Sequence, residues 1–345
     1  MRKLLHIFIF GIVLSFATNF SIADDGNTVG SSKGDFQKVG ASGSQFLKIG
    51  VGARGASMSA HAAAVNDLSS IWWNPAGLAD VKTIGADFAF TQWFAGFQHL
   101  FAAASMPLGS NFTVAASLTS FTSEDIEITT IHNPNGTGHF YKVSDMAAAL
   151  SLAGYLTEDF SFGVNMKYIS NGFSSLSSSA IAFDVGTLYN TGLYGIKLGF
   201  AISNLGTEMK YTGQDLQTLT KLYQQSTNAP IDAEYISGKY NMPLIFRAGI
   251  ASEVYKTEDH SVMAAFDFTT LSDTPEQFAV GAEYTFRNLI SIRGGYLMNQ
   301  DQFGLSGGIG FKYDAGSGIK AGMDYSINPT NDIGIINRLS VRIGF

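Results

Sequence analysis

Charged residues of both signs recur at alternate positions in segments of this 345-residue chain that otherwise hold small or apolar side chains. Alternate residues of a β-strand share a face, so these side chains would stand together on polar strand faces. Acids and bases held there can pair with one another, form a polar wall for a passing solute, or serve acid–base catalysis. The residues concerned are Lys167, Lys197, Arg247, Glu253, Asp267, Glu283, Arg293, Lys312, Asp324, Arg338 and Arg342.

We expect pairing to be the main role of these residues, with a solute-contacting wall as the alternative. The sequence shows no triad order, no metal-ligand spacing and no phosphate-binding loop, so neither an enzymatic site nor a cofactor is predicted. Gly50–Gly55 matches a dinucleotide-binding pattern by letter, but it does not join a hydrophobic strand to a helix. The absence of cysteine excludes disulfides and zinc–thiolate sites.

The elements that position these residues are strands, because apolar residues recur with a period of two. In Phe160–Tyr168, apolar side chains alternate with Ser161, Gly163, Asn165 and Lys167. The same period recurs in residues 194–203, 244–253, 278–286 and 319–327. The polar faces hold mainly Gly, Ala and Ser, and the apolar faces carry Phe and Tyr at strand ends, as transmembrane barrels do. We expect the apolar faces to contact lipid and the charged residues to face the lumen.

A soluble β-sandwich or barrel with an apolar interior is the alternative, and composition argues against it. Charged residues make up 14% of the chain, whereas soluble domains hold about 25%. A lipid-facing surface needs no charges to keep it solvated. The formal net charge of −7 argues against nucleic-acid binding. No window after the leader holds 18 uninterrupted apolar residues, so no transmembrane helix is expected.

Residues 1–23 have the pattern of a secretory signal peptide. Arg2 and Lys3 precede the apolar run Leu4–Phe16, and Ser21–Ala23 supplies small residues for cleavage. A membrane anchor is the alternative, but the run is shorter than the roughly 20 residues that span a bilayer. Residues 24–82 hold a Gly/Ser-rich lead-in, expected to be periplasmic, and a small-residue-rich segment in which residues 56–67 could form a short helix.

Residues 83–345 are predicted to form an antiparallel barrel of about fourteen strands, because short and more variable connections alternate from Ile84 onward. The short connections are expected at residues 108–111, 157–159, 190–192, 256–259, 287–289 and 314–318. The others are expected at residues 92–96, 131–140, 171–176, 210–239, 271–275, 298–302 and 328–331. The terminal strand also alternates and ends on Phe345, as in substrates of the barrel-assembly machinery.

Gly43–Val81 carries a family resemblance in the runs FLKIGVGARGASM (Phe46–Met58) and WNPAGLA (Trp73–Ala79). The segment resembles the N-terminal part of the PorV/PorQ branch of FadL-like outer-membrane barrels. The resemblance implies an all-β transmembrane barrel with this segment as a plug in its lumen. It also implies a location in the outer membrane of a Gram-negative-type bacterium.

The resemblance implies two non-enzymatic roles. PorV-like members assist type IX protein secretion or surface attachment, so their partners would be secretion components or cargo C-terminal domains. Other FadL-like barrels transport hydrophobic small molecules, which is the alternative. A purely structural outer-membrane protein is a third hypothesis.

Two stretches leave alternatives open. Trp72, Trp73, Asn74, Pro75 and Ala76 are expected to pack the plug against the wall, with gating of a passage as the alternative. Residues 210–239 place Leu216, Leu219, Leu222 and Tyr223 at roughly helical spacing. This stretch is expected to cap the barrel or, alternatively, to bind a partner outside the cell.

Overall fold

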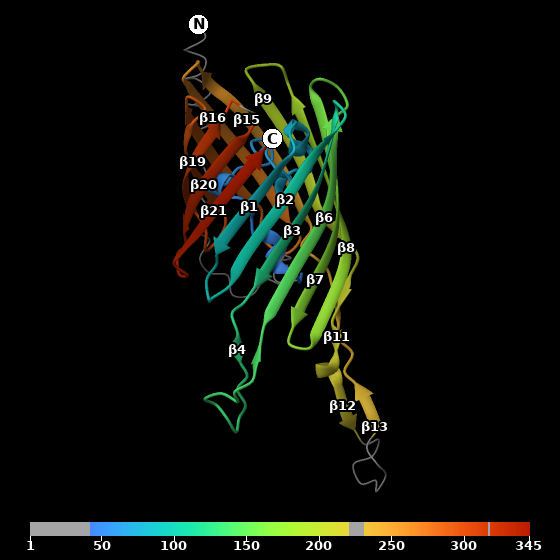
Figure 1. Ribbon diagram of the computed structural model, residues 1–345. Helices are drawn as coiled ribbons and strands as arrows, with labels where there is room; N and C mark the ends of the chain where they lie inside the picture. Colours follow the sequence, from blue (N-terminus) through green and yellow to red (C-terminus); the bar gives the residue numbers. More distant parts are fainter. Residues whose placement is uncertain (1–41, 221–230, 317) are drawn as a thin grey trace, which may run out of the picture. The chain divides into compact units, whose positions relative to one another are not determined.

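Within residues 42–220, 231–316 and 318–345, which the computed structural model describes, fourteen strands form a closed antiparallel barrel (Figure 1). The first seven are β1 (Gly85–Gln92), β2 (Gln98–Leu108), β3 (Phe112–Thr122), β6 (Val143–Tyr155), β7 (Phe160–Phe173), β8 (Leu176–Asn190) and β9 (Ile196–Gly206). The other seven are β15 (Ile245–Lys256), β16 (His260–Leu271), β17 (Gln277–Phe286), β18 (Ile290–Met298), β19 (Leu305–Asp314), β20 (Lys320–Pro329) and β21 (Ile335–Gly344).

The barrel closes where its first strand pairs with its last. Gly85 of β1 lies opposite Gly344 of β21, and the register continues to Gln92 opposite Asn337. An even number of antiparallel strands brings both ends of the wall to one side, as closed bacterial barrels require. The predicted barrel of about fourteen strands is confirmed.

Short strands extend beyond the wall at the end with the longer connections. They are β4 (Ile126–Glu127), β5 (Phe140–Tyr141), β10 (Met209–Lys210), β11 (Thr212–Gly213), β12 (Gln217–Thr220), β13 (Ile231–Glu234) and β14 (Lys239–Tyr240), with the 3₁₀ turn η3 at Gln214–Leu216. In the stretch with roughly helical spacing, Leu216 ends η3 and Leu219 lies in β12, which pairs with β13. Leu222 and Tyr223 lie outside the described residues. The loop expected at residues 171–176 is also shorter, because Asn171 pairs with Ser178.

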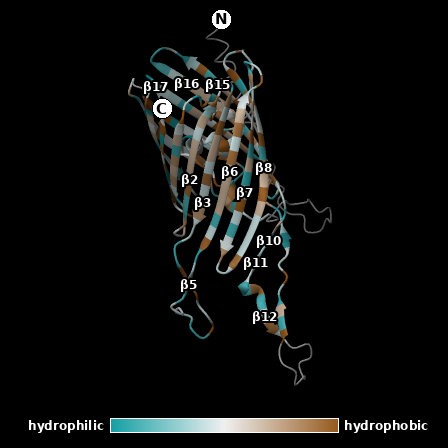
Figure 2. Cartoon of the chain, turned by 45° about the vertical axis from the view of Figure 1, so that its right-hand side comes forward, coloured by the Kyte–Doolittle hydropathy of each residue, from teal (hydrophilic) through white to brown (hydrophobic). Residues whose placement is uncertain are grey.

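The wall has its apolar side chains outside. In β7, Val164, Met166 and Tyr168 are exposed, whereas Asn165 and Lys167 between them are buried. Figure 2 shows hydrophobic residues along the wall strands, and exposed Phe, Leu, Ile and Met side chains recur on most of them. Contiguous apolar surface of this extent marks contact with a membrane. The barrel is therefore a transmembrane barrel with lipid-facing apolar residues.

The plug lies inside the barrel and consists of short helical turns. They are η1 (Gln45–Lys48), α2 (Ala53–Met58), α3 (Ser70–Trp73) and η2 (Pro75–Asp80). The helix expected over residues 56–67 is wrong, because α2 stops at Met58 and Ser59 adopts a left-handed backbone conformation. None of the helices in the described part of the chain is long and apolar enough to cross a membrane. The predicted leader (1–23) and lead-in (24–41) lie outside the described residues.

Candidate functional site

The Trp72–Ala76 segment is buried between the rest of the plug and the wall. Trp73 donates its indole N–H to the Val51 carbonyl at 3.1 Å, and the His61 ring stacks on it with centroids 3.7 Å apart. The Asn74 side chain donates to the Ala62 carbonyl at 2.7 Å and accepts from the Ala76 N–H at 3.1 Å. Asn74 thus caps η2, and Pro75 takes its first position, where the missing N–H loses nothing.

Glycines in the wall let this turn approach the barrel closely. A Cβ on Gly163 of β7 would lie 2.2 Å from the Pro75 carbonyl carbon, and one on Gly186 of β8 would lie 2.0 Å from the Asn74 side-chain oxygen. Asn74 also donates across the gap to the Thr187 carbonyl at 3.1 Å. The Asn–Pro turn and these wall positions are therefore complementary in shape.

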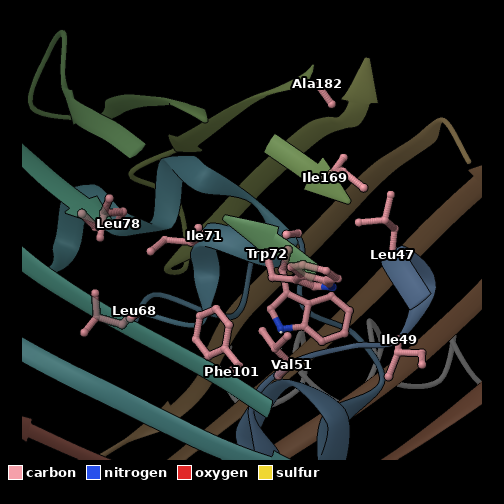
Figure 3. Close-up of a cluster of buried hydrophobic side chains, with 14 of the residues drawn as sticks. Leu47, Ile49, Val51, Leu68, Ile71, Trp72, Leu78, Phe101, Ile169 and Ala182 are labelled. Carbon is pink, nitrogen blue, oxygen red and sulfur yellow. Dashed lines mark hydrogen bonds between the residues drawn. The ribbon is translucent and has the colours of Figure 1, made fainter. Parts of the chain in front are cut away.

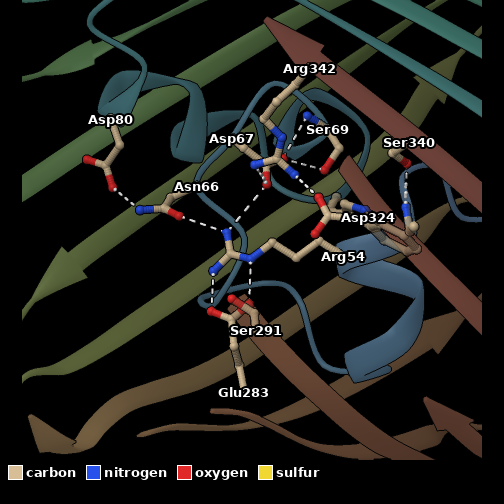
Figure 4. A network of polar contacts seen from close by, with 12 residues as sticks. Arg54, Asn66, Asp67, Ser69, Asp80, Glu283, Ser291, Asp324, Ser340 and Arg342 are labelled. Carbon is tan, nitrogen blue, oxygen red and sulfur yellow. Dashed lines mark hydrogen bonds and ion pairs between the residues drawn. The ribbon is translucent and has the colours of Figure 1, made fainter. Parts of the chain in front are cut away.

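On another side of the plug, six charged side chains form an ion-pair ring, which we define as Arg54, Asp67, Glu283, Arg293, Asp324 and Arg342. Arg342 is half-buried and the other five are buried. Figure 4 labels all of them except Arg293. Arg54 of α2 contacts both oxygens of Glu283 at 3.1 Å, and its Nη1 lies 3.4 Å from Asp67. Each guanidinium lies between two carboxylates, so three positive charges are balanced by three negative ones.

The wall half of the ring comes from four strands. Arg293 of β18 contacts Glu283 of β17 and lies 2.6 Å from Asp324 of β20. Arg342 of β21 lies 2.5 Å from Asp324 and 3.1 Å from the plug's Asp67. Because a buried charge is stable only when paired, the ring ties the plug to this part of the wall.

Electrostatics of the plug groups follow from these contacts. Burial disfavours the charge on Asp67, but Arg342 and Arg54 outweigh it and hold the pKa of the carboxyl below its ordinary value. Burial likewise opposes the charge on Arg54, yet Glu283 and Asp67 raise its pKa above the ordinary value. Burial lowers the pKa of His61 despite the neighbouring Asp267, so the ring that stacks on Trp73 is neutral at neutral pH.

A second group of charges surrounds the plug on strands β7, β8, β15 and β16. Lys167 of β7 pairs with Asp184 of β8 at 2.7 Å and lies 5.7 Å from the Trp72 ring centroid. Asp267 of β16 accepts the backbone N–H groups of His61 and Ala62 at 2.6 and 2.8 Å.

Arg247 of β15 adds a cation–π contact, because its guanidinium lies 5.5 Å from the Trp73 ring centroid.

The remaining predicted residues lie apart from these groups. Lys197 reaches Asp80 of the plug at 3.7 Å. Arg338 donates to Asn328, which in turn donates to the Ala56 carbonyl at 3.0 Å. Lys312 is near the ion-pair ring without joining it. Glu253 lies near the end of β15, just before a bulge, and is exposed there in a pair with Lys256 at 2.8 Å.

An apolar cluster fills the space between the plug and the wall strands β1 to β8 (Figure 3). It begins with Phe46 and Met209, near the longer connections, and extends to Leu78 near the short turns. Phe101 of β2 and Ile169 of β7 are its wall contacts, and Trp72 lies among them. We call this contiguous group the apolar seam. The plug therefore has ion pairs toward β17, β18, β20 and β21 and mainly apolar contacts toward β1 to β8.

Sequence reasoning missed the plug's own charges. Within residues 43–79, which hold mainly small and apolar side chains, Lys48, Arg54 and Asp67 are the charged residues, and that isolation was a usable signal. A lone charge in such a run needs a buried partner. The partners themselves come from strands more than 200 residues away and have no local signature. Among the described residues, no group of His, Asp and Glu is arranged to hold a metal ion.

Fold and site together define a transmembrane barrel with an ion-paired plug, and solved structures share this FadL-like fold. The chain is similar to the monoaromatic hydrocarbon channel CymD, with 13% identity over 86% of this chain and 98% of that one, at a TM-score of 0.57. It is similar to the toluene transporter TbuX of Ralstonia pickettii, with 13% identity over 85% and 96% and a TM-score of 0.54.

A FadL homologue of Pseudomonas aeruginosa is also similar, with 12% identity over 86% of this chain and 98% of that one and a TM-score of 0.51. No protein-family model matches the chain, and no curated protein matches it. Because the sequence identities are only 12–13%, the similarity to these structures is a similarity of fold.

Proposed function

We propose that this protein is a non-enzymatic outer-membrane channel for small hydrophobic molecules. The apolar seam is the observation that carries the proposal. It follows the plug from the longer connections to the short turns, where a porin would have a polar, water-filled passage. CymD is named as a monoaromatic hydrocarbon channel and TbuX as a toluene transporter, which supports the same solute class.

The plug contacts suggest how such a solute passes. Ion pairs and backbone hydrogen bonds hold the plug to β16, β17, β18, β20 and β21. Toward the seam, single hydrogen bonds from Asn74 to β8, from Asn165 of β7 and from Thr113 of β3 hold it, and the other contacts are mainly apolar. Apolar contacts are non-directional, so an apolar solute can replace them without leaving a polar group unpaired. We propose that Trp73–Ala76 stay packed while solute moves along the seam beside Trp72.

Uptake by a deletion strain tests this function. Loss of the gene should slow the entry of toluene several-fold, while entry of a sugar of similar size stays unchanged. Complementation with the wild-type gene should restore entry. Unchanged toluene uptake in the deletion strain would contradict the proposal.

A second candidate is type IX secretion or surface attachment, as in the PorV/PorQ branch. The runs FLKIGVGARGASM and WNPAGLA favour it. The similar structures are hydrocarbon channels, so the transport function has the greater support. Mild-detergent purification of the tagged barrel tests the secretion role. Recovery of neither a secretion component nor a cargo C-terminal domain would remove its support.

Export and insertion belong to the same proposal. We propose that residues 1–23 are removed after export and that the barrel-assembly machinery recognises β21 with the final Phe345. The outer-membrane fraction should contain a chain that starts after Ala23 and migrates faster unboiled than boiled on a gel. A chain found in the soluble periplasmic fraction would contradict this location.

A further inference from the structure

The end of the lumen with the longer connections holds a cavity that the transport proposal does not use. Its volume is about 280 Å³, and it lies between the first residues of the plug and the adjoining ends of β6, β7 and β8. Ser44 and Gln45 contribute from the plug, and Val143, Asp145 and Phe173 from the wall. Its volume is close to the lower limit of about 300 Å³ for small-molecule sites.

The cavity has one carboxylate and no matching cation among the lining residues that the structure describes. Asp145 is half-buried and hydrogen-bonded to Asn171, a neutral amide. Three lysines lie close in sequence to lining residues. Lys48 lies 2.7 Å from Asp273, Lys142 lies 3.4 Å from Asp125, and Lys210, next to Tyr211, is exposed and is not among the residues that line the cavity. A partly desolvated carboxylate of this kind favours a positively charged guest.

Two aromatic rings complete the wall of the cavity. Tyr211 stacks on Tyr240 with centroids 5.5 Å apart, and Phe173 meets Tyr141 edge-on at 5.0 Å. The second ring of each pair supports the one that lines the cavity. Aromatic faces attract ammonium groups and pack against their carbon substituents, and Val143 and Leu176 add apolar surface.

We propose that this cavity binds a small organic ammonium ion that carries an apolar or aromatic substituent. The carboxylate of Asp145 pairs with the ammonium group, and Phe173 and Tyr211 contact the substituent. A neutral arene leaves Asp145 without a positively charged partner, and an organic anion is repelled by it. A bare metal ion finds a single carboxylate here, fewer than its usual set of oxygen ligands.

The site goes beyond the proposed transport function, because binding here does not require passage through the barrel. Calorimetric titration of the purified full-length barrel in detergent tests it with three phenylalkyl solutes that differ in charge: phenethylammonium, 2-phenylethanol and 3-phenylpropionate. We expect the ammonium ion to bind at least tenfold more tightly than the alcohol. The carboxylate should bind more weakly than both.

Asp145→Asn keeps the shape of the cavity and removes its charge. This variant should bind phenethylammonium at least tenfold more weakly and the alcohol about as well as the wild type. Asp301→Asn, an exposed position on the β18–β19 connection at the same end of the barrel, serves as the matched control and should leave both affinities unchanged. Phe173→Leu should weaken ammonium binding several-fold.

Equal ammonium affinity in wild type and Asp145→Asn would overturn the proposal. So would tighter binding of the carboxylate, or the absence of ammonium binding to the folded wild type at millimolar concentration. The gel shift on boiling verifies that each variant is folded. Because toluene uptake is measured separately, failure of the cation site is distinguishable from failure of the transport proposal.

Discussion

At the scale of single residues, the ion-pair ring makes each of its charges depend on two others. Arg54 and Arg293 both contact Glu283, and Arg293 and Arg342 both contact Asp324. Exchanging a whole buried pair for apolar residues is often tolerated, whereas removing one partner leaves an uncompensated charge. The ring therefore specifies one position of the plug more than it adds net stability.

Glu283→Gln should destabilise the folded barrel by about 3–5 kcal/mol, because it leaves two buried guanidinium groups short of a counter-charge. Urea unfolding in detergent, followed by tryptophan fluorescence, measures the change. Glu253→Gln is the control, since Glu253 forms an exposed pair with Lys256 whose loss should change stability by about 0–1 kcal/mol. Similar effects of the two substitutions would contradict the ring's role.

Asp67 should make the free energy of unfolding depend on pH. Its pKa is depressed in the folded state by Arg342 and Arg54 against the effect of burial, so its contribution is present above the ordinary carboxyl pKa of about 4 and lost as pH falls below it. The stability difference between wild type and Asp67→Asn should therefore be constant from pH 7 to pH 5 and shrink in more acidic solution. A stability difference that grows on acidification would show that the pKa of Asp67 is not depressed in the folded state.

At the scale of elements, the plug turns and the wall strands are matched in shape. The Asn74–Pro75 turn contacts Gly163 and Gly186 of the wall. Within the plug, the Trp73 ring packs against Gly50, where a Cβ would lie 2.0 Å from the Cη2 atom of Trp73. Small residues on both surfaces permit this approach. A β-strand accepts larger side chains at these positions, so the close approach of the plug is the reason for glycine at Gly163 and Gly186.

Gly186→Val should displace the plug, because its first side-chain atom would overlap the Asn74 oxygen. We expect a higher steady conductance across planar bilayers and a stability loss of at least about 1–3 kcal/mol. Gly294→Val in β18 is the control, since the nearest atom to a Cβ there is 3.9 Å away. Wild-type conductance in a folded Gly186→Val barrel would refute the close fit.

A charge introduced on the lipid-facing side of a wall strand should destabilise the barrel, whereas one introduced on the β4–β5 extension should not. Leu150 of β6 is 67% exposed on the lipid-facing side, and Leu150→Arg should cost about 2–4 kcal/mol if it lies near the bilayer midplane. Ile131, 97% exposed on the β4–β5 extension, is the control, and Ile131→Arg should be nearly neutral. Unfolding in lipid vesicles measures both. A harmless Leu150→Arg would mean that this face does not contact lipid.

At the scale of the whole molecule, closure between β1 and β21 gives every wall strand two partners. A closed sheet has no free edge, so its backbone groups are satisfied without water. Closure also joins segments about 250 residues apart, which places Arg342 of the last strand within reach of the plug.

An engineered disulfide tests that closure. Ala86 and Ile343 are directly opposed across the β1–β21 pair, and opposed side chains have Cβ atoms about 4.5–5.5 Å apart. In a chain with no natural cysteine, Ala86→Cys with Ile343→Cys should form an intramolecular disulfide visible as a gel shift under non-reducing conditions. Ala86→Cys with Met323→Cys, one strand farther, should not. Equal cross-linking of both pairs would contradict the register.

The sequence by itself determined the barrel, its approximate strand number and which faces contact lipid. These properties follow from a period of two and from the alternation of short and longer connections, which are local in the chain. Single residues within the pattern could still depart from it. Glu253 has the right parity for the lumen, but it lies near the end of β15, where it is exposed and pairs with Lys256.

Only the tertiary structure decided which charges meet. The ring joins Arg54 and Asp67 to residues of four strands, and the apolar seam joins Phe46 to Phe101 and Ile169. The period of two in a strand predicts that a side chain points inward. Which residue it contacts there depends on the stagger and closure of the whole barrel. Local pattern carries no information on that geometry, because the contacts form across the lumen between segments distant in the chain.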